Sequence, residues 1–131
     1  MRESRLRCER HPRALVVDDE ELVRGLLARA TADVGFEVAT AASVEQALAL
    51  LRADPEIDLL VTDLTMPTRS GLELIDELRQ DRPHLPCLLV SGTFTTDVLR
   101  RCQQLGVHVL SKPTGWQELQ HTLERIRHDN R

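Results

Sequence analysis

Charged and hydroxyl-bearing side chains stand where four short apolar runs of this sequence end. Asp18 and Asp19 follow residues 14–17, Asp63 follows residues 57–62, Ser91 follows residues 87–90, and Lys112 comes just after residues 107–110. Carboxylates that lie close together repel one another, which raises their pKa values and favours a counterion. Hard oxygen ligands select Mg²⁺, with Mn²⁺ as the alternative, rather than zinc. The sequence therefore predicts a divalent cation site if these groups meet in the fold.

Taken one at a time, these residues also have ordinary explanations. Asp18 and Asp19 favour the positive N-terminus of a following helix, and Asp63 suits the turn before Pro67. Ser91 fits ordinary loop chemistry, and Lys112 fits a surface turn before Pro113. Their coincidence at the ends of successive apolar runs favours a site over four separate structural roles.

The elements that must position these groups alternate regularly along the chain. Five apolar runs predict strands at residues 14–17, 36–40, 57–62, 87–90 and 107–110, and an amphipathic helix follows each one. The apolar positions of the five helices, in chain order, are Leu22, Val23, Leu26, Leu27, Ala30 and Val34; Ala47, Leu48, Leu50 and Leu51; Leu72, Leu74, Ile75 and Leu78; Val98, Leu99, Cys102 and Leu105; and Trp116, Leu119, Leu123 and Ile126.

Capping signals mark where several of these helices begin and end. Ser43 with Gln46, and Ser70 with Glu73, have the spacing of a capping box. A third box is expected for Gln117 in a helix that starts near Thr114, and Gly35 supplies a stop for the first helix.

Continuous apolar strands that alternate with helices predict an α/β fold with a parallel sheet covered on both faces. In an open sheet of this kind, sites lie beyond the carboxyl ends of the strands. The acidic residues, Ser91 and Lys112 are therefore expected to converge at one edge of the sheet.

Composition excludes several classes of function. Residues 1–13 carry a net charge of +3 and the rest of the chain −7, so DNA binding by the folded part is not expected. The chain has two Phe, one Trp and no Tyr, which argues against a stacking platform for single-stranded nucleic acid. Its three cysteines have no C-x-x-C spacing, which suits a cytoplasmic location and argues against a disulfide framework or a zinc site. No apolar run is long enough to cross a membrane.

The ordered set of motifs resembles the receiver domain of two-component response regulators. The segments that carry the resemblance are Leu15–Glu20, Leu60–Pro67 with Gly71 following, Leu89–Gly92 and Leu110–Pro113, and it extends over about residues 13 to 127. The resemblance implies a (βα)5, flavodoxin-like doubly wound sheet of five parallel strands in the order 2-1-3-4-5. It also implies a signalling domain rather than an enzyme that turns over a separate substrate.

The resemblance assigns a role to each site residue. Asp63 matches the aspartate that accepts a phosphoryl group from a phosphohistidine. Asp18, Asp19, Asp63 and the backbone carbonyl of Thr65 match the ligands of Mg²⁺. Ser91 matches the hydroxyl that hydrogen-bonds the phosphoryl group, Lys112 matches the lysine that pairs with it, and Pro113 matches a proline after a cis peptide bond.

One position departs from the family pattern. The family usually has Tyr or Phe three residues before the lysine, where this chain has Val109. The neighbouring His108 is expected on the other side of the strand. Phe94 is expected to pack in the loop after the fourth strand, and Gly92, where Ala is usual, should loosen that loop.

Three other functions compete with a phosphoacceptor receiver. A receiver-like docking module would not need the complete set of Asp18, Asp19, Asp63, Ser91 and Lys112. A haloacid-dehalogenase-type phosphatase would need a second aspartate where this chain has Thr65. A flavodoxin-like cofactor binder would need a phosphate loop after the first strand, where this chain is acidic.

The domain boundaries and partners are expected as follows. Residues 1–12 form a leader or linker, residues 13–128 the receiver domain and residues 129–131 a tail. The expected partners are a sensor histidine kinase or a histidine phosphotransfer domain, with no nucleic acid and no membrane. The domain itself is expected to be a monomer or a weak dimer.

Overall fold

The computed structural model describes residues 11–112 and 115–129, and in these the strands and helices alternate as the sequence predicts. The elements are β1 (Arg13–Val17), α2 (Glu21–Asp33), β2 (Glu37–Ala41), α3 (Val44–Ala53), β3 (Ile57–Asp63), α4 (Gly71–Asp81), β4 (Cys87–Ser91), α5 (Thr96–Leu105), β5 (His108–Ser111) and α6 (Trp116–Asp129). The strands at residues 36–40 and 107–110 were each predicted one residue too early. Thr114, Pro113 and residues 1–10 and 130–131 of the predicted leader and tail lie outside the described residues.

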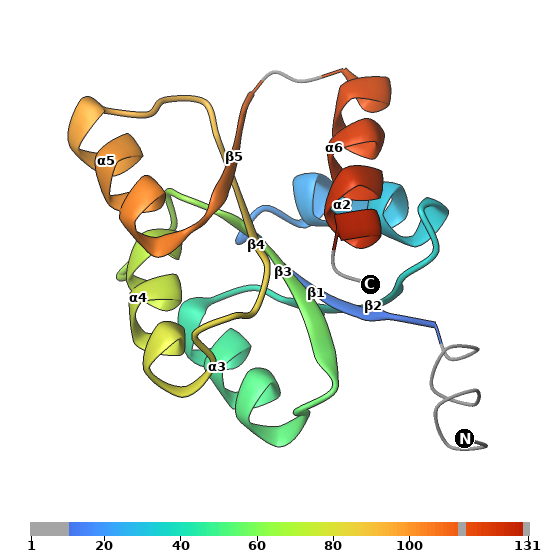
Figure 1. Cartoon of the computed structure of the whole chain (residues 1–131), viewed down its shortest axis with the longest axis horizontal. Coiled ribbons are helices and arrows are strands. Elements are labelled where there is room, and N and C mark those ends of the chain that lie inside the picture. The colour runs from blue at the N-terminus through green and yellow to red at the C-terminus, as the bar shows by residue number, and fades with distance from the viewer. Residues whose placement is uncertain (1–10, 113–114, 130–131) are drawn as a thin grey trace.

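All five strands are parallel and lie in the order β2-β1-β3-β4-β5, which confirms the predicted doubly wound sheet. Helices α2 and α6 cover one face, and α3, α4 and α5 cover the other (Figure 1). β3 is buried along nearly its whole length because it lies between β1 and β4 and has helices on both faces. The central strands are therefore held rigidly on both sides, which suits them to position a site at their ends.

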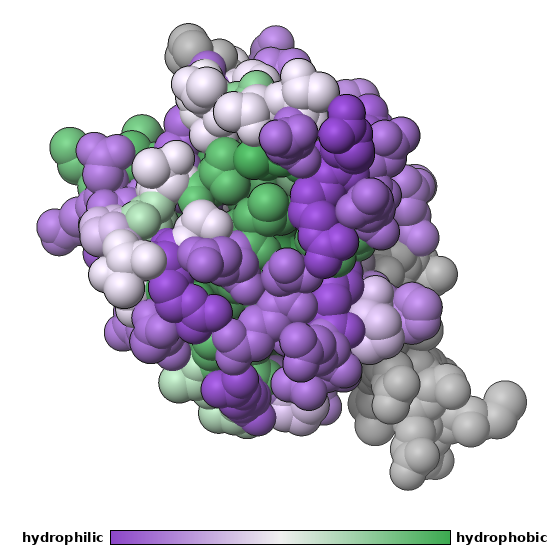
Figure 2. Space-filling model, turned by 90° about the vertical axis from the view of Figure 1, so that its left-hand side faces the viewer, coloured by the Kyte–Doolittle hydropathy of each residue, from purple (hydrophilic) through white to green (hydrophobic). Residues whose placement is uncertain are grey.

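Two apolar clusters form the core, one on each face of the sheet. One cluster packs Leu74 and Ile75 of α4 and Ala47 of α3 against strand residues such as Leu60. The other packs Leu123 of α6 and Ala30 of α2 against the opposite face. Figure 2 shows the side of the molecule where α4 and α5 lie, with hydrophilic side chains around a hollowed area of apolar ones.

The caps explain where helices begin. Ser70 accepts a hydrogen bond from the Glu73 backbone N–H at 3.1 Å, and the Glu73 side chain accepts one from the Ser70 backbone N–H at 2.8 Å, so the predicted capping box is confirmed. At α3, Ser43 accepts from the Gln46 N–H at 3.1 Å, but the Gln46 side chain accepts from Ala42 rather than from Ser43. The predicted box at α3 is therefore only half formed.

Several apolar residues on the predicted helix faces are not buried. Leu22 of α2 is 84% exposed and Leu26 is 60% exposed, and Leu99 and Trp116 also lie at the surface. On α2 the predicted Leu27 and Ala30 are buried, together with Thr31, which was not among the predicted positions. Helical spacing finds the apolar positions of a helix, but burial depends on what packs against them. α6 packs beside α2, and Leu22 and Leu26 stay exposed.

No helix in the described part of the chain is long and apolar enough to span a membrane.

Candidate functional site

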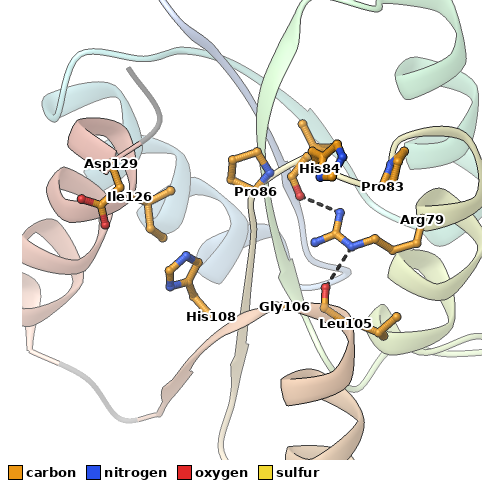
Figure 3. Close-up of a pocket in the computed structure, with 10 residues that line it drawn as sticks. Arg79, Pro83, His84, Pro86, Leu105, Gly106, His108, Ile126 and Asp129 are labelled. Carbon is orange, nitrogen blue, oxygen red and sulfur yellow. Dashed lines mark hydrogen bonds between the residues drawn. The ribbon is translucent and has the colours of Figure 1, made fainter.

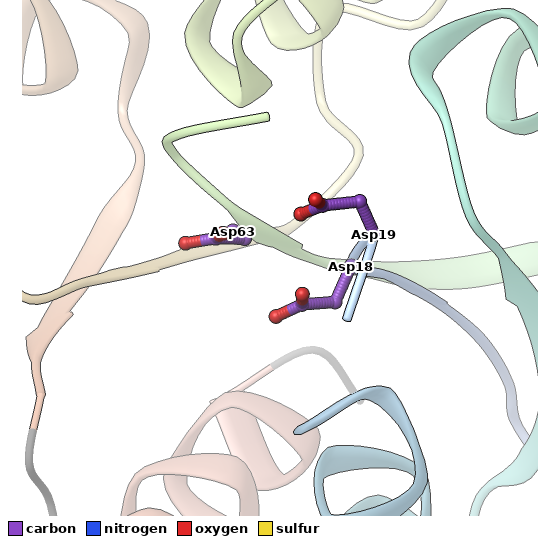
Figure 4. A group of neighbouring side chains, drawn as sticks. All are labelled: Asp18, Asp19 and Asp63. Carbon is purple, nitrogen blue, oxygen red and sulfur yellow. The ribbon is translucent and has the colours of Figure 1, made fainter. Parts of the chain in front are cut away.

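The carboxyl ends of β1 and β3 bring three carboxylates together. Asp18 and Asp19 come directly after β1, and Asp63 is the last residue of β3. One oxygen from each of the three lies within 4.8 Å of the others. Figure 4 shows all three side chains pointing to the same side, beyond the ends of these strands. The predicted convergence of the acidic residues is therefore confirmed.

The three carboxylates differ sharply in exposure. Asp18 is completely buried and Asp63 is 7% exposed, whereas Asp19 lies open to solvent. Burial raises the pKa of the Asp18 carboxyl, and the nearby Asp63 raises it further, while the Glu20 backbone N–H and Lys112 oppose that shift. Asp18 is thus the member of the cluster whose negative charge costs the most in the absence of a cation.

Lys112 supplies a positive charge on the other side of the cluster. Its ammonium Nζ lies 3.4 Å from Asp63 Oδ1 and 3.7 Å from Asp18 Oδ2. The Lys112 backbone N–H donates to the Ser91 carbonyl at 2.7 Å, which extends the pairing of β4 with β5 by one residue. The lysine is therefore fixed through its backbone, and one ammonium balances only part of three negative charges.

The donor set fits a hard divalent cation. Asp18 Oδ1 accepts a hydrogen bond from the Glu20 N–H at 2.9 Å, but its buried Oδ2 accepts none from any described group. An unsatisfied, buried carboxylate oxygen is costly, and a cation would satisfy it. Two carboxylates besides Asp18 lie close enough to share that cation, and all are oxygen ligands of the kind Mg²⁺ takes. Thr65 lies two residues after Asp63, in the loop before α4, with its side chain exposed.

Ser91 is buried at the end of β4, but its hydroxyl is engaged within its own loop. The hydroxyl donates to the Thr93 carbonyl at 3.0 Å and accepts from the Thr93 backbone N–H at 3.2 Å. Phe94, in the same loop, is half-buried and packs against the cluster of α3, α4 and α5, as predicted. Ser91 is thus at the predicted edge without contacting the carboxylates.

The two neighbouring residues of β5 lie on opposite faces of the sheet. Val109 pairs with Leu89, whose side chain belongs to the cluster under α3, α4 and α5, and His108 pairs with Leu88 of the other cluster. The predicted orientation of His108 away from Val109 is confirmed. Val109 is 39% exposed, because β5 is the edge strand.

Two further residues support the site: Arg24 was not singled out from the sequence, and Gly71 was named there only as part of a motif, without a role. Arg24 of α2 donates from Nη1 to the Asp18 carbonyl at 2.9 Å and so ties the helix to the acidic turn. Gly71 begins α4 so close to β3 that a Cβ there would lie 2.1 Å from the Asp63 carbonyl oxygen. The sequence feature that could have identified Arg24 is its place as a basic residue one turn into the helix that follows Asp18 and Asp19. A residue with a side chain does not fit at position 71, because the backbones of Asp63 and Gly71 are in contact.

A hollow at the opposite edge of the sheet has a different character. Arg79, Pro86 and His108 are among the residues that line it (Figure 3). The Arg79 guanidinium donates to the Leu105 carbonyl at 3.0 Å and to the Leu85 carbonyl at 2.6 Å. These bonds satisfy the end of α5 and the loop before β4, so Arg79 acts here as a structural tie.

Known proteins match this chain in sequence and in fold. A sequence profile described as the response regulator receiver domain matches residues 14–124. The chain belongs to the response regulator receiver family. Receiver domains are signalling modules of two-component systems, and the fold of this chain is that of the family.

Relatives of known name agree with this membership. The chain is 36% identical over 104 residues to the response regulator receiver protein Anae109_2439 of Anaeromyxobacter, covering 79% of this chain and 43% of that protein. It is 32% identical over 117 residues to the DNA-binding transcriptional regulator NtrC of Azospirillum brasilense, covering 88% of this chain and 24% of that protein. The chain thus spans less than half the length of these curated relatives.

Solved structures match over nearly the whole chain. The chemotaxis protein CheY4 of Vibrio cholerae superposes with a TM-score of 0.82 at 27% identity, covering 89% of this chain and 99% of that one. The receiver domain of NtrX from Brucella abortus superposes with a TM-score of 0.79 at 30% identity, covering 88% of this chain and 98% of that one.

Proposed function

We propose that Asp63 accepts a phosphoryl group from the phosphohistidine of a sensor histidine kinase or a histidine phosphotransfer domain, in a reaction that depends on Mg²⁺. The observation that carries the proposal is the convergence of the Asp63 carboxylate with two further carboxylates and the Lys112 ammonium. In this arrangement Asp63 is the nucleophile, Asp18, Asp19, Asp63 and the Thr65 carbonyl hold the cation, and Lys112 is a fixed positive charge.

The transfer exchanges one bond to phosphorus for another. A carboxylate oxygen of Asp63 forms a P–O bond as the P–N bond to the donor imidazole breaks, and the imidazole retains the bonding electron pair and takes up a proton. Phosphoryl transfer passes through a loose transition state that demands little of the nucleophile, so even a weakly nucleophilic carboxylate needs mainly alignment and neutralisation of charge. When bound, Mg²⁺ would neutralise phosphoryl oxygens beside the acidic residues.

Lys112 and Ser91 would then hold the product. The ammonium already lies 3.4 Å from Asp63 Oδ1, within reach of an added phosphoryl group. The Ser91 hydroxyl can donate to a phosphoryl oxygen only by giving up its bond to the Thr93 carbonyl. A charge-assisted hydrogen bond is stronger than the neutral one that it replaces, so the exchange favours movement of the loop after β4.

This loop is the proposed route from the phosphoryl group to partner binding. Val109 has no ring that could swing between a buried and an exposed position. Phe94 lies three residues after Ser91 and packs on the core beside α5, so displacement of residues 92–94 reaches α5 directly. We propose that α5 and the loop before it, rather than β5, carry most of the response.

The phosphorylation test uses small phosphodonors, so that no cognate kinase is needed. Protein is incubated with phosphoramidate or acetyl phosphate and Mg²⁺, and its intact mass is measured. We expect one phosphoryl adduct in the wild type, none in Asp63→Asn, and none when a chelator removes the cation. Asp58→Asn is the matched control, because Asp58 lies on the same strand but binds the Arg13 backbone N–H at 2.9 Å.

Two results would contradict the phosphoacceptor role. An adduct of equal yield in Asp63→Asn would place the phosphoryl group elsewhere. Failure of the wild type to react with these donors and also with an active histidine kinase would favour a docking module instead. The cytoplasmic location and the monomeric or weakly dimeric state stay predictions.

A further inference from the structure

Backbone strain is concentrated in the loop that joins β3 to α4. Thr68 has a φ of +75°, and among the described residues no other non-glycine residue has a positive φ. The Arg69 N–H donates to the Pro67 carbonyl at 2.8 Å, so residues 67–69 form a three-residue turn with Thr68 at its centre. A central φ near this value belongs to the strained form of the γ-turn, and a β-branched residue is poorly suited to it.

Arg69, which closes this turn, is tied to two helices. Its Nη1 lies 3.1 Å from Glu45 Oε2 of α3, and its Nη2 lies 2.7 Å from Glu77 Oε1 of α4. The Arg69 side chain is only 29% exposed, so these pairs are partly sheltered from water. The two hydrogen bonds from Arg69 and Arg52 lower the pKa of Glu77, which keeps that carboxylate charged.

The two ends of the loop are held in other ways. Met66 is buried in the core, and the Gly71 N–H donates to the Leu64 carbonyl at 2.8 Å. The segment between these anchors contains the strained Thr68, and Arg69 is its tie to the body of the domain. A strained conformation persists only where the surrounding structure holds it.

We propose that Arg69 is a positioning residue for the metal site. Its ion pairs with α3 and α4 hold the strained turn, and the turn acts through Pro67 and Met66 on the Thr65 carbonyl, which lies three residues before Thr68. The proposal rests on the proposed function, in which that carbonyl is a ligand. Groups that orient metal ligands without touching the metal commonly contribute tenfold or more to metal affinity.

The direction in which the Mg²⁺ affinity changes when Arg69 is replaced distinguishes a positioning role from a purely electrostatic one. Removing a positive charge near an acidic cluster would strengthen the binding of a divalent cation. Loss of positioning would weaken it. Arg69→Met should therefore bind Mg²⁺ about tenfold more weakly than the wild type if the residue acts through the loop.

The experiment measures Mg²⁺ affinity by isothermal titration calorimetry without any phosphodonor. Arg69→Met is compared with Arg52→Met, which removes the other partner of Glu77, at 2.8 Å, but leaves the turn tied. We expect normal affinity for Arg52→Met. Thr68→Gly, added to Arg69→Met, should restore most of the affinity because glycine adopts a positive φ without strain. Circular dichroism checks that each variant is folded.

Each outcome bears on one idea. Unchanged or tighter Mg²⁺ binding by Arg69→Met would overturn the positioning role, as would an equal loss in Arg52→Met. Failure of Thr68→Gly to restore affinity would overturn the part played by the strained turn. A wild-type protein that binds no Mg²⁺ would overturn the metal site itself, and the role of Arg69 with it.

Discussion

Replacing Asp18 by Asn should stabilise the metal-free protein. The Asp18 carboxylate is buried, its pKa is raised by burial, and one of its oxygens accepts no hydrogen bond from a described group. The neutral amide has nearly the same shape and can keep the hydrogen bond from the Glu20 N–H. The substitution therefore removes a charge that costs stability while it preserves the packing.

The expected size follows from the opposing charges. At 4.8 Å, the greatest separation within the cluster, two carboxylates repel by about 3.5 kcal/mol with an effective dielectric constant of about 20, and closer pairs repel more strongly. The attraction of Lys112 at 3.7 Å is about 4.5 kcal/mol on the same scale and cancels the repulsion from Asp63. Two costs of the Asp18 charge then remain: its repulsion from the exposed Asp19 and the hydration that it loses on burial. The weaker hydrogen bond between the amide and the Glu20 N–H reduces the benefit of removing them. We therefore expect Asp18→Asn to raise the free energy of unfolding by about 1–2 kcal/mol.

The assay is thermal unfolding in a chelator at neutral pH. A gain of that size should raise the Tm of Asp18→Asn by about 4–8 °C in a domain of this length. Glu124→Gln removes one exposed carboxylate of α6 and should leave the Tm nearly unchanged. Saturating Mg²⁺ should reverse the order, because a ligand at a hundredfold excess over its Kd adds about 2.7 kcal/mol to the wild type only.

The pH dependence has a defined sign. A raised pKa in the folded state means that ionisation of Asp18 costs stability above that pKa and nothing below the unfolded value of 3.8. The advantage of Asp18→Asn should therefore shrink as the pH falls toward about 4. If Asp18→Asn is no more stable than the wild type in chelator at neutral pH, the conclusion that the Asp18 charge destabilises the metal-free protein is refuted.

Three further predictions test other parts of the structure. Gly71→Ala should lower the free energy of unfolding in urea by about 3 kcal/mol, because its Cβ would lie 2.1 Å from the Asp63 carbonyl oxygen. Gly25→Ala is the control and should be stabilising, because a Cβ there would meet nothing within 4 Å. Equal effects of the two substitutions would contradict the close approach of Gly71 to β3. Burial lowers the pKa of His108 and Arg125 lowers it further, while Asp129 opposes the shift. The stability that the neutral His108 side chain contributes should therefore be present above about pH 6.5 and be lost as the pH falls below that value. His108→Gln should remove this part of the acid sensitivity, and identical wild-type and variant profiles of the urea midpoint between pH 7.5 and 5.5 would contradict it. Hydrogen exchange in the beryllofluoride complex should change most over residues 92–100, and changes centred on residues 107–110 with residues 92–100 silent would overturn the proposed route through α5.

Much of the site could be predicted because its groups stand at the ends of strands. Each apolar run is short and continuous, so the residue that ends it is easy to identify, and a parallel sheet brings those ends to one edge. Asp18, Asp19, Asp63 and Lys112 meet there for that reason. The sequence pattern does not distinguish the buried Asp18 from the exposed Asp19, since this depends on which way two adjacent side chains turn at the end of β1.

Contacts between distant segments could not be predicted in the same way. The pairs of Arg69 with Glu45 and Glu77 join residues that have no common periodicity, and the exposure of Leu22 depends on which helix packs beside α2. The engagement of Ser91 with Thr93 is a choice of side-chain rotamer within a loop. Tertiary packing decides each of these features, and helical or strand spacing carries no information about them.

The position of the phosphoryl group tests the central claim most directly. An aspartyl phosphate is an acyl phosphate, which borohydride reduces to the alcohol, converting that aspartate to homoserine. Wild-type protein treated with phosphoramidate and Mg²⁺, reduced, digested and sequenced by tandem mass spectrometry should contain homoserine at position 63. Aspartate at position 63 in every phosphorylated and reduced molecule, or homoserine at position 18 or 19 instead, would contradict the assignment.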